Sequence, residues 1–266
     1  MALRDSDKEW EQIGRRDPYY GVLSLDKFRT EQLDNDSLEE FFTSGRDHID
    51  FVLETIRTSV APGFSPSRAL DFGCGVGRCT IPLTRVCASV VGVDVSDSML
   101  REAAKNCAER SISDLTLVQS DDDLTGVSGP FDFVHSFLVF QHIPEKRGQK
   151  ILIRLIELMS DNGVAAVQFV YHREDSAAIR IMGFLRKKLP LWHTFVNLLY
   201  GKRFSEPLIE KNVYDFNQLL AILADHGCAN VHLRFFARRK LRSVAVFFQK
   251  MPDQGRRVLE ASSLSA

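Results

Sequence analysis

The chain has 266 residues, 44% hydrophobic, 10% aromatic and 26% charged, with a formal net charge of −1. This composition is that of a globular protein with one large domain, and it offers no basic field for nucleic acid. No apolar run reaches the roughly 20 residues of a membrane-spanning helix, and the polar first residues do not resemble a signal peptide, so we expect a cytoplasmic protein.

Residues 1–64 are predicted to form an N-terminal helical lid. An aromatic stretch, Asp17-Pro18-Tyr19-Tyr20, precedes a helix whose start is indicated by the capping box Ser37-Leu38-Glu39-Glu40. Apolar side chains then recur at helical spacing from Ile49 to Val60. Gly45 either breaks this helix or weakens it.

Residues 65–250 are predicted to form an α/β core. Strands are expected at 68–72, 89–94, 115–119, 131–137 and 164–170, because these runs are apolar on both parities. Helical patterns lie between them, one over 97–110 capped by Ser96 or Asp97, and one from Pro144 through Met159 that Asn162-Gly163 stops. This alternation predicts a doubly wound, mainly parallel sheet.

The stretch 171–213 is too long for a plain connection, and we interpret it as a helical cap insertion over the functional edge of the sheet. A helix over 215–227 follows, and then two strands, 231–237 and 243–250. Their short link requires antiparallel pairing. Residues 251–266 are predicted to be a disordered tail.

The five cysteines are an odd number with no CxxC spacing. We therefore expect buried free thiols, and no metal site.

The most informative segment is the glycine-rich turn after the first strand, Asp71-Phe72-Gly73-Cys74-Gly75-Val76-Gly77. Such a turn lets the backbone approach a ligand closely. Its G-x-G-x-G spacing is not the dinucleotide pattern G-x-G-x-x-G, and Asp71 would repel a pyrophosphate but attract a cation. Asp94, at the end of the second strand, can accept both hydroxyls of a ribose. Together these residues predict a ribonucleoside with a cationic, phosphate-free end, which S-adenosylmethionine provides.

These motifs resemble those of class I S-adenosylmethionine-dependent methyltransferases. The glycine turn, the segment Val91–Leu100, the acidic turn Gln119–Leu124 and the segment Phe131–Pro144 follow in the family's order. The last is similar to the ubiquinone/menaquinone-biosynthesis-like branch. The resemblance implies a Rossmann-like seven-stranded sheet whose last strand is antiparallel.

The resemblance also implies site roles. The three glycines would line the methionine end, Asp71 would organise its amine and Asp94 would hold the ribose. Met99 would pack on the adenine, Asp121 would accept its exocyclic amine, and Asp122 would contribute a main-chain amide. The full predicted cofactor site is Asp71, Gly73, Gly75, Gly77, Asp94, Val95, Met99, Asp121, Asp122 and Ser136.

Methyl transfer from a sulfonium needs alignment and, for some acceptors, a general base. His142 and His172 follow the fourth and fifth strands, so they are the predicted catalytic residues, with His48 as a further candidate. Neither the Asn/Asp-Pro-Pro-aromatic motif of amino-group methylation nor a Pro-Cys nucleophile for pyrimidine C5 is present.

We therefore expect transfer to an O or N atom of a small-molecule, sugar or lipid-linked acceptor, with no nucleic-acid partner. Two sets of residues suggest a roofed, largely apolar acceptor pocket: the aromatic residues Tyr19, Tyr20, Phe41 and Phe42, and the apolar residues of the cap insertion, Phe184, Leu185, Trp192, Phe195, Leu198, Leu199 and Tyr200. Basic clusters leave peripheral membrane contact open. Alternatives are a catalytically silent S-adenosylmethionine-binding protein and an NAD(P)-linked oxidoreductase.

Overall fold

The computed structural model describes residues 6–174, 211–238 and 240–252. Most of the predicted cap insertion and of the predicted tail lies outside these ranges. Within them, no helix is both long and apolar enough to cross a bilayer.

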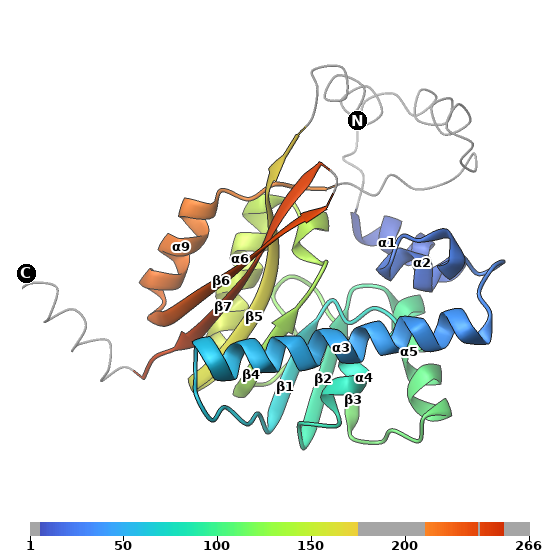
Figure 1. The fold of residues 1–266 in the computed structure, drawn as a ribbon, viewed down its shortest axis with the longest axis horizontal. Helices are drawn as coiled ribbons and strands as arrows, with labels where there is room; N and C mark the ends of the chain where they lie inside the picture. The colour runs from blue at the N-terminus through green and yellow to red at the C-terminus, as the bar shows by residue number, and fades with distance from the viewer. Residues whose placement is uncertain (1–5, 175–210, 239, 253–266) are drawn as a thin grey trace, which may run out of the picture.

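A seven-stranded sheet in the order β3-β2-β1-β4-β5-β7-β6 forms the centre of the molecule (Figure 1). Neighbours from β3 to β5 pair in parallel, and β7 pairs antiparallel with both β5 and β6. The predicted sheet with an antiparallel last strand is confirmed. The strands are β1 (Arg68–Phe72), β2 (Ser89–Asp94), β3 (Leu115–Gln119), β4 (Phe131–Ser136), β5 (Met159–Arg173), β6 (Cys228–Arg238) and β7 (Leu241–Lys250).

Helices cover both faces of the sheet, because the central strands are apolar on both parities. In β1, Ala69 packs toward α3 (Asn35–Ser59), whereas Leu70 packs toward α6 (Glu145–Glu157) and α9 (Phe216–Asp225). Shorter elements complete the fold: α1 (Ser6–Arg16), α2 (Pro18–Val22), η1 (Asp26–Phe28), α4 (Thr80–Leu83), α5 (Asp97–Glu109) and η2 (Phe140–His142).

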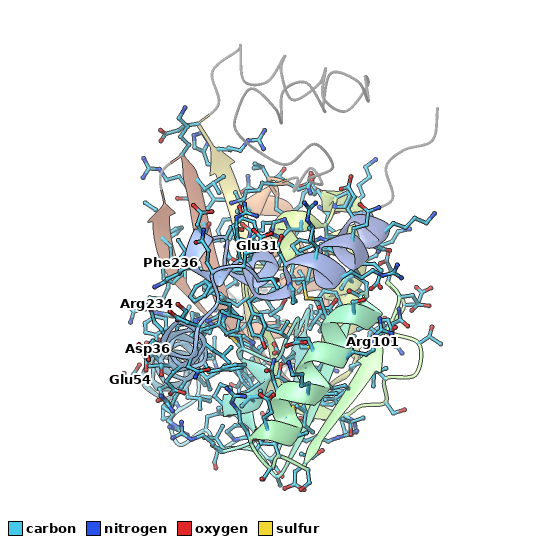
Figure 2. The ribbon with its side chains drawn as sticks, turned by 90° about the vertical axis from the view of Figure 1, so that its right-hand side faces the viewer. Glu31, Asp36, Glu54, Arg101, Arg234 and Phe236 are labelled. Atoms are coloured by element: carbon cyan, nitrogen blue, oxygen red, sulfur yellow. The ribbon has the colours of Figure 1, made fainter. Side chains whose placement is uncertain are left out.

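Helix α3 begins earlier than predicted. Asp34 is its N-cap, and the Asp34 carboxylate accepts a hydrogen bond of 2.8 Å from the Ser37 amide. The Ser37 capping box is therefore wrong, because an aspartate three residues earlier takes the cap position. The outer face of α3 presents charged side chains such as Asp36 and Glu54 to solvent (Figure 2).

Gly45 does not break α3. A Cβ at this position would lie 1.9 Å from the backbone oxygen of Arg78. The glycine thus allows the helix to contact the segment that follows the glycine turn.

Helix α6 ends at Glu157, before the predicted stop at Asn162-Gly163, and Met159 already belongs to β5. Asn162 has a positive φ of 61° where the pairing of β4 with β5 shifts register. The Asn-Gly signal therefore marks an irregularity within a strand rather than a helix end.

Candidate functional site

A cavity opens at the carboxyl ends of the parallel strands. The space inside it, including open solvent at its mouth, is about 810 Å³. Its walls are Ser6, Asp7, Trp10, Gly21, Val22, Phe72, Gly73, Gly75, Val93, Asp94, Val95, Met99, Ser120, Asp121, Asp122, Phe137, Leu138, Val139, His142, Ile143, Arg147 and Ile151.

The glycine turn forms one wall through its backbone. Gly73 and Gly75 have positive φ angles of 74° and 54°, which glycine adopts without strain. A Cβ on Gly73 would lie 2.3 Å from Val139, and one on Gly75 would lie 2.8 Å from Val22. Larger residues would therefore close the cavity here. The two glycines leave space in which a ligand can approach the main chain closely.

Asp94 lies at the end of β2 and faces the same cavity. One carboxylate oxygen accepts from the Gly75 amide and the other from the Ser96 amide, each at 2.9 Å. A carboxylate has about four acceptor positions, so both oxygens retain capacity for a diol. Burial raises the pKa of Asp94 to about 6, although the two amide hydrogen bonds favour the charged form.

The acidic turn after β3 also lines the cavity, through Ser120, Asp121 and Asp122. The Asp121 carboxylate accepts from the amides of Thr125 and Asp123 at 3.1 Å and so closes its own turn; the Thr125 amide bond lowers its pKa, against a smaller effect of burial. The Asp122 carboxylate instead contacts Arg147 Nε at 2.5 Å. Arg147 also donates to Asp7 at 2.8 and 2.9 Å, and this guanidinium therefore joins α1 to the acidic turn.

The two predicted base residues lie in different places. His142 lines the cavity and contacts Trp10 edge-on, with ring centroids 4.8 Å apart. His172 is exposed on β5, paired in register with Arg242 of β7, and does not line the cavity.

Three predicted cofactor residues, Asp71, Gly77 and Ser136, also do not line this cavity. Asp71 is 2% exposed, and its oxygens accept from Thr80 Oγ1 at 2.5 Å and contact His135 Nδ1 at 2.8 Å. Ser136 Oγ donates to the Phe72 oxygen. The Asp71 and Ser136 side chains thus support the turn from outside the cavity. The predicted residues that line the cavity are Gly73, Gly75, Asp94, Val95, Met99, Asp121 and Asp122.

The sequence predicted an N-terminal lid, but it identified none of the residues by which α1 and α2 line the cavity. Ser6, Asp7 and Trp10 line the cavity from α1, and Gly21 and Val22 line it from α2. A signal for α1 existed: acids in its first turn, and Arg15 and Arg16 in its last.

Three of the aromatic residues expected to roof the acceptor pocket have another place, and the cap-insertion residues of that prediction lie outside the described ranges. Tyr19, Phe41 and Phe42 pack edge-on against one another in a buried cluster. They therefore form part of the core rather than a wall of this cavity.

The comparison with family models finds a methyltransferase domain over residues 69–163. Aklanonic acid methyltransferase from Streptomyces sp. is 29% identical over 129 residues, covering 47% of this chain and 54% of that protein. A ubiquinone biosynthesis O-methyltransferase from Rhizobium johnstonii is 24% identical over 147 residues, covering 53% and 58%. A 23S rRNA (uracil(1939)-C(5))-methyltransferase from Haemophilus influenzae is 30% identical over 135 residues, covering 49% and 28%. The matched region thus covers 28–58% of the length of these three curated relatives.

The fold matches that of magnesium protoporphyrin IX methyltransferase from Synechocystis, crystallised with bound S-adenosylhomocysteine. The match has a TM-score of 0.59 at 19% identity and covers 92% of this chain and 100% of that one. At this identity the likeness concerns the fold.

Proposed function

We propose that this chain, which carries a methyltransferase domain of the class I S-adenosylmethionine-dependent family, transfers a methyl group to an O or N atom of a small-molecule, sugar or lipid-linked acceptor. The observation that carries the proposal is the cavity in which Asp94 and the Gly73–Gly75 backbone face one another. S-adenosylmethionine, when bound, supplies an electrophilic methyl group on a sulfonium.

The residues present fit that cofactor. Asp94 retains acceptor capacity for the ribose hydroxyls, and the glycine backbone leaves room for the amino-acid end. Met99 is apolar and 2% exposed, which suits packing against adenine. Asp121 and Asp122 of the acidic turn line the part of the cavity proposed for the adenine.

Charge disfavours the alternative of an NAD(P)-linked oxidoreductase. Four carboxylates line the cavity (Asp7, Asp94, Asp121 and Asp122), whereas Arg147 is its one guanidinium among the described residues and is already paired with two of them. A pyrophosphate would be repelled, and a cationic ligand would be attracted.

The same acids favour a small molecule over RNA as the acceptor, because a polyanion needs basic contacts. One matched relative is named as an rRNA methyltransferase, so RNA belongs among the acceptors to be tested. Trp10, Leu138 and Val139 give the cavity an apolar wall, which suits an acceptor with apolar surface.

In this mechanism the chain's residues mainly align and exclude water. His142 lies at the cavity wall and is the proposed base where the acceptor's hydroxyl or amine must lose its proton. The glycine backbone and Asp94 hold the donor side.

Calorimetry of S-adenosylhomocysteine binding tests the cofactor site. Asp94→Ala is expected to weaken binding by about 1–3 kcal/mol, or about 5- to 150-fold, because hydroxyls lose a buried partner. Asp97→Ala, an aspartate on the solvent side of α5 that pairs with Arg101, is the matched control and should bind like the wild type. Wild-type affinity in Asp94→Ala, or binding of NADH in place of S-adenosylhomocysteine, would contradict the proposal.

Turnover separates an enzyme from a silent binding protein. The full chain is incubated with S-adenosylmethionine and panels of phenolic, sugar, lipid-linked and RNA acceptors, and release of S-adenosylhomocysteine is measured. We expect release above the acceptor-free background with a small-molecule panel. Binding of S-adenosylmethionine, with no release of S-adenosylhomocysteine in any of the panels, would support a catalytically silent binding protein.

A further inference from the structure

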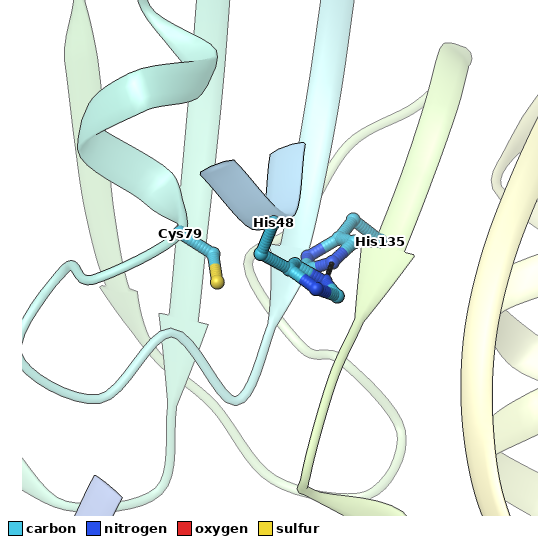
Figure 3. A group of neighbouring side chains, drawn as sticks. All are labelled: His48, Cys79 and His135. Atoms are coloured by element: carbon cyan, nitrogen blue, oxygen red, sulfur yellow. Dashed lines mark hydrogen bonds between the residues drawn. The ribbon is translucent and has the colours of Figure 1, made fainter. Parts of the chain in front are cut away.

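A second group of chemistry-bearing side chains lies beneath the cofactor cavity and has no part in the proposed reaction. His48 comes from α3, Cys79 from the N-cap of α4 and His135 from β4 (Figure 3). Their ligand atoms all lie within 4.8 Å of one another, and the Nε2 atoms of the two histidines are 3.0 Å apart. Cys79 and His135 are buried.

The surrounding residues fix how His135 presents its ring. Its Nδ1 contacts the Asp71 carboxylate at 2.8 Å, and Asp71 is itself held by Thr80. An Nδ1–H that donates to Asp71 leaves the Nε2 lone pair directed at His48. Carboxylate–histidine pairs of this kind orient the histidine ligands of metal sites.

His48 is also held in place. Its ring lies on Phe137, with centroids 3.9 Å apart and planes 34° from parallel. Because both imidazoles are fixed from outside the cluster, little ordering would accompany the binding of an ion between them.

We propose that His48, Cys79 and His135 form a Zn²⁺ site. Two imidazole nitrogens and one thiolate are the ligands that zinc prefers in proteins. Tetrahedral bonds of about 2.0–2.1 Å to nitrogen and 2.3 Å to sulfur place the two nitrogens about 3.3 Å apart and the sulfur about 3.6 Å from each. The observed spacing is within a few tenths of an ångström for the histidine pair and requires the thiol to approach by at most about 1.2 Å.

Zinc binding changes the protonation of Cys79 and His48. The Cys79 thiol loses its proton to the solvent when the zinc–sulfur bond forms. The His48 proton that bridges the two Nε2 atoms moves to His48 Nδ1, and both rings turn so that their Nε2 lone pairs face the metal, which lies off the line between the two nitrogens. No electrons change hands.

The fourth position fits water. A small cavity beside the cluster, lined by His48, His135, Ser136 and Gln168 among others, has room for about one water molecule. Phe137 lines both this cavity and the cofactor cavity. The ion would thus tie α3 to the floor of the cofactor site.

Without an ion, the same pair is a plain hydrogen bond from His48 Nε2–H to His135 Nε2. Metal binding to the full chain, purified without a metal-affinity step and treated with a chelator, distinguishes the two. We expect one Zn²⁺ per chain, and with Co²⁺ as the probe the thiolate-to-cobalt charge-transfer band and the intense visible bands of a four-coordinate ion.

Variants assign the ligands. Cys79→Ser should abolish the charge-transfer band. Loss of a residue that only hydrogen-bonds a metal ligand weakens metal binding by about 10- to 100-fold. Loss of a ligand itself, in Cys79→Ser or His48→Gln, should weaken Zn²⁺ binding by at least this factor. Cys87→Ser is the control, since Cys87 is a buried thiol of the same apolar cluster that is not part of the group.

Thiol labelling keeps the test independent of variant folding. In the wild-type chain, Zn²⁺ should slow alkylation of Cys79, followed by mass spectrometry, and leave Cys87 unchanged. Unequal protection of these two cysteines supports the site. Binding that is equally tight in Cys79→Ser, or no protection of Cys79, would overturn it. Because none of these readouts involves S-adenosylmethionine, their outcome is independent of the proposed function.

Discussion

At the scale of single residues, the two histidines predicted as bases, His142 and His172, differ in what surrounds them. His142 stands at the cavity wall against Trp10, whereas His172 is exposed on β5. His142 follows β4 and His172 lies near the carboxyl end of β5, so strand order alone does not distinguish them. The geometry makes His142 the proposed base.

His142→Asn is expected to lower kcat by about 10²- to 10⁴-fold with an acceptor whose hydroxyl or amine must lose a proton. Binding of S-adenosylhomocysteine should stay within twofold or so of wild type, since the change preserves polarity. His172→Asn is the matched control and should leave kcat unchanged. The measurement is steady-state kinetics with the acceptor found in the panel, and a loss confined to His172→Asn would contradict the assignment.

The residues that were predictable from sequence share one property: a local motif fixes their place. Gly73, Gly75 and Asp94 sit at strand ends, and their cavity positions follow from the strand pattern. Asp7 and Arg147 meet only because distant segments fold together. The His48–Cys79–His135 group likewise comes from three separate elements, so no spacing rule could indicate it.

At the scale of elements, the Glu11 side chain connects helix α1 to the start of α5 by hydrogen bonds. Glu11 accepts from the Ser96 hydroxyl at 2.8 Å, and from the Ser98 amide and hydroxyl at 3.1 and 2.7 Å. A carboxylate at a helix N-terminus is favourable. Burial alone would raise the pKa of Glu11, but the hydrogen bonds from Ser98 and Ser96 lower it to about 2.

Glu11→Ala is expected to reduce the free energy of unfolding by about 1.5–3 kcal/mol at neutral pH, because hydrogen bonds to a charged group are lost. The folded-state pKa lies below the ordinary 4.5, so the wild-type advantage is full above pH 4.5 and disappears as the pH falls toward 2. Urea unfolding at a series of pH values measures it. The control is Glu54→Ala, on the exposed face of α3 (Figure 2), which should change the free energy of unfolding by no more than about 0.5 kcal/mol. A stability difference between wild type and Glu11→Ala that does not change with pH would contradict this explanation.

Helix α3 depends on a close approach at Gly45. Gly45→Ala would gain about 0.5–1 kcal/mol of helix preference, but the new Cβ would lie 1.9 Å from a backbone oxygen that cannot turn aside. We expect a net loss of stability of at least about 1–3 kcal/mol. Arg46→Ala, at the next and exposed position, is the control in the same urea titration; a stabilised Gly45→Ala would show that the contact is absent.

These elements also show where pattern reasoning stops. The strands were predictable because their apolar runs are local. Ser96 was one of two neighbouring candidates for the cap of α5, and its hydroxyl accepts from the Met99 amide. The start of α3 was not predictable, since two polar residues competed for one cap. The docking of α1 was not either, because it depends on Glu11 meeting a helix end far along the chain.

At the scale of the whole molecule, the cavity is shared between the sheet edge and the N-terminal helices. Trp10 of α1 and Val22 of α2 face Gly75, Asp94 and His142 of the core. A ligand held between these two parts adds its binding free energy to folding, because the unfolded chain has no such cavity.

S-adenosylhomocysteine at about 100 times its Kd should therefore stabilise the full chain by about 2.7 kcal/mol and raise Tm by about 5–10 °C. Hydrogen exchange should slow in α1, α2 and the Gly73–Gly77 turn, while the edge strand β6, whose Phe235 is 62% exposed, stays unchanged. NADH at the same concentration should raise Tm by less than about 1 °C, since the carboxylates repel its pyrophosphate. A rise with NADH alone would place a dinucleotide in the cavity, and protection confined to the core strands would show that α1 and α2 do not hold the ligand.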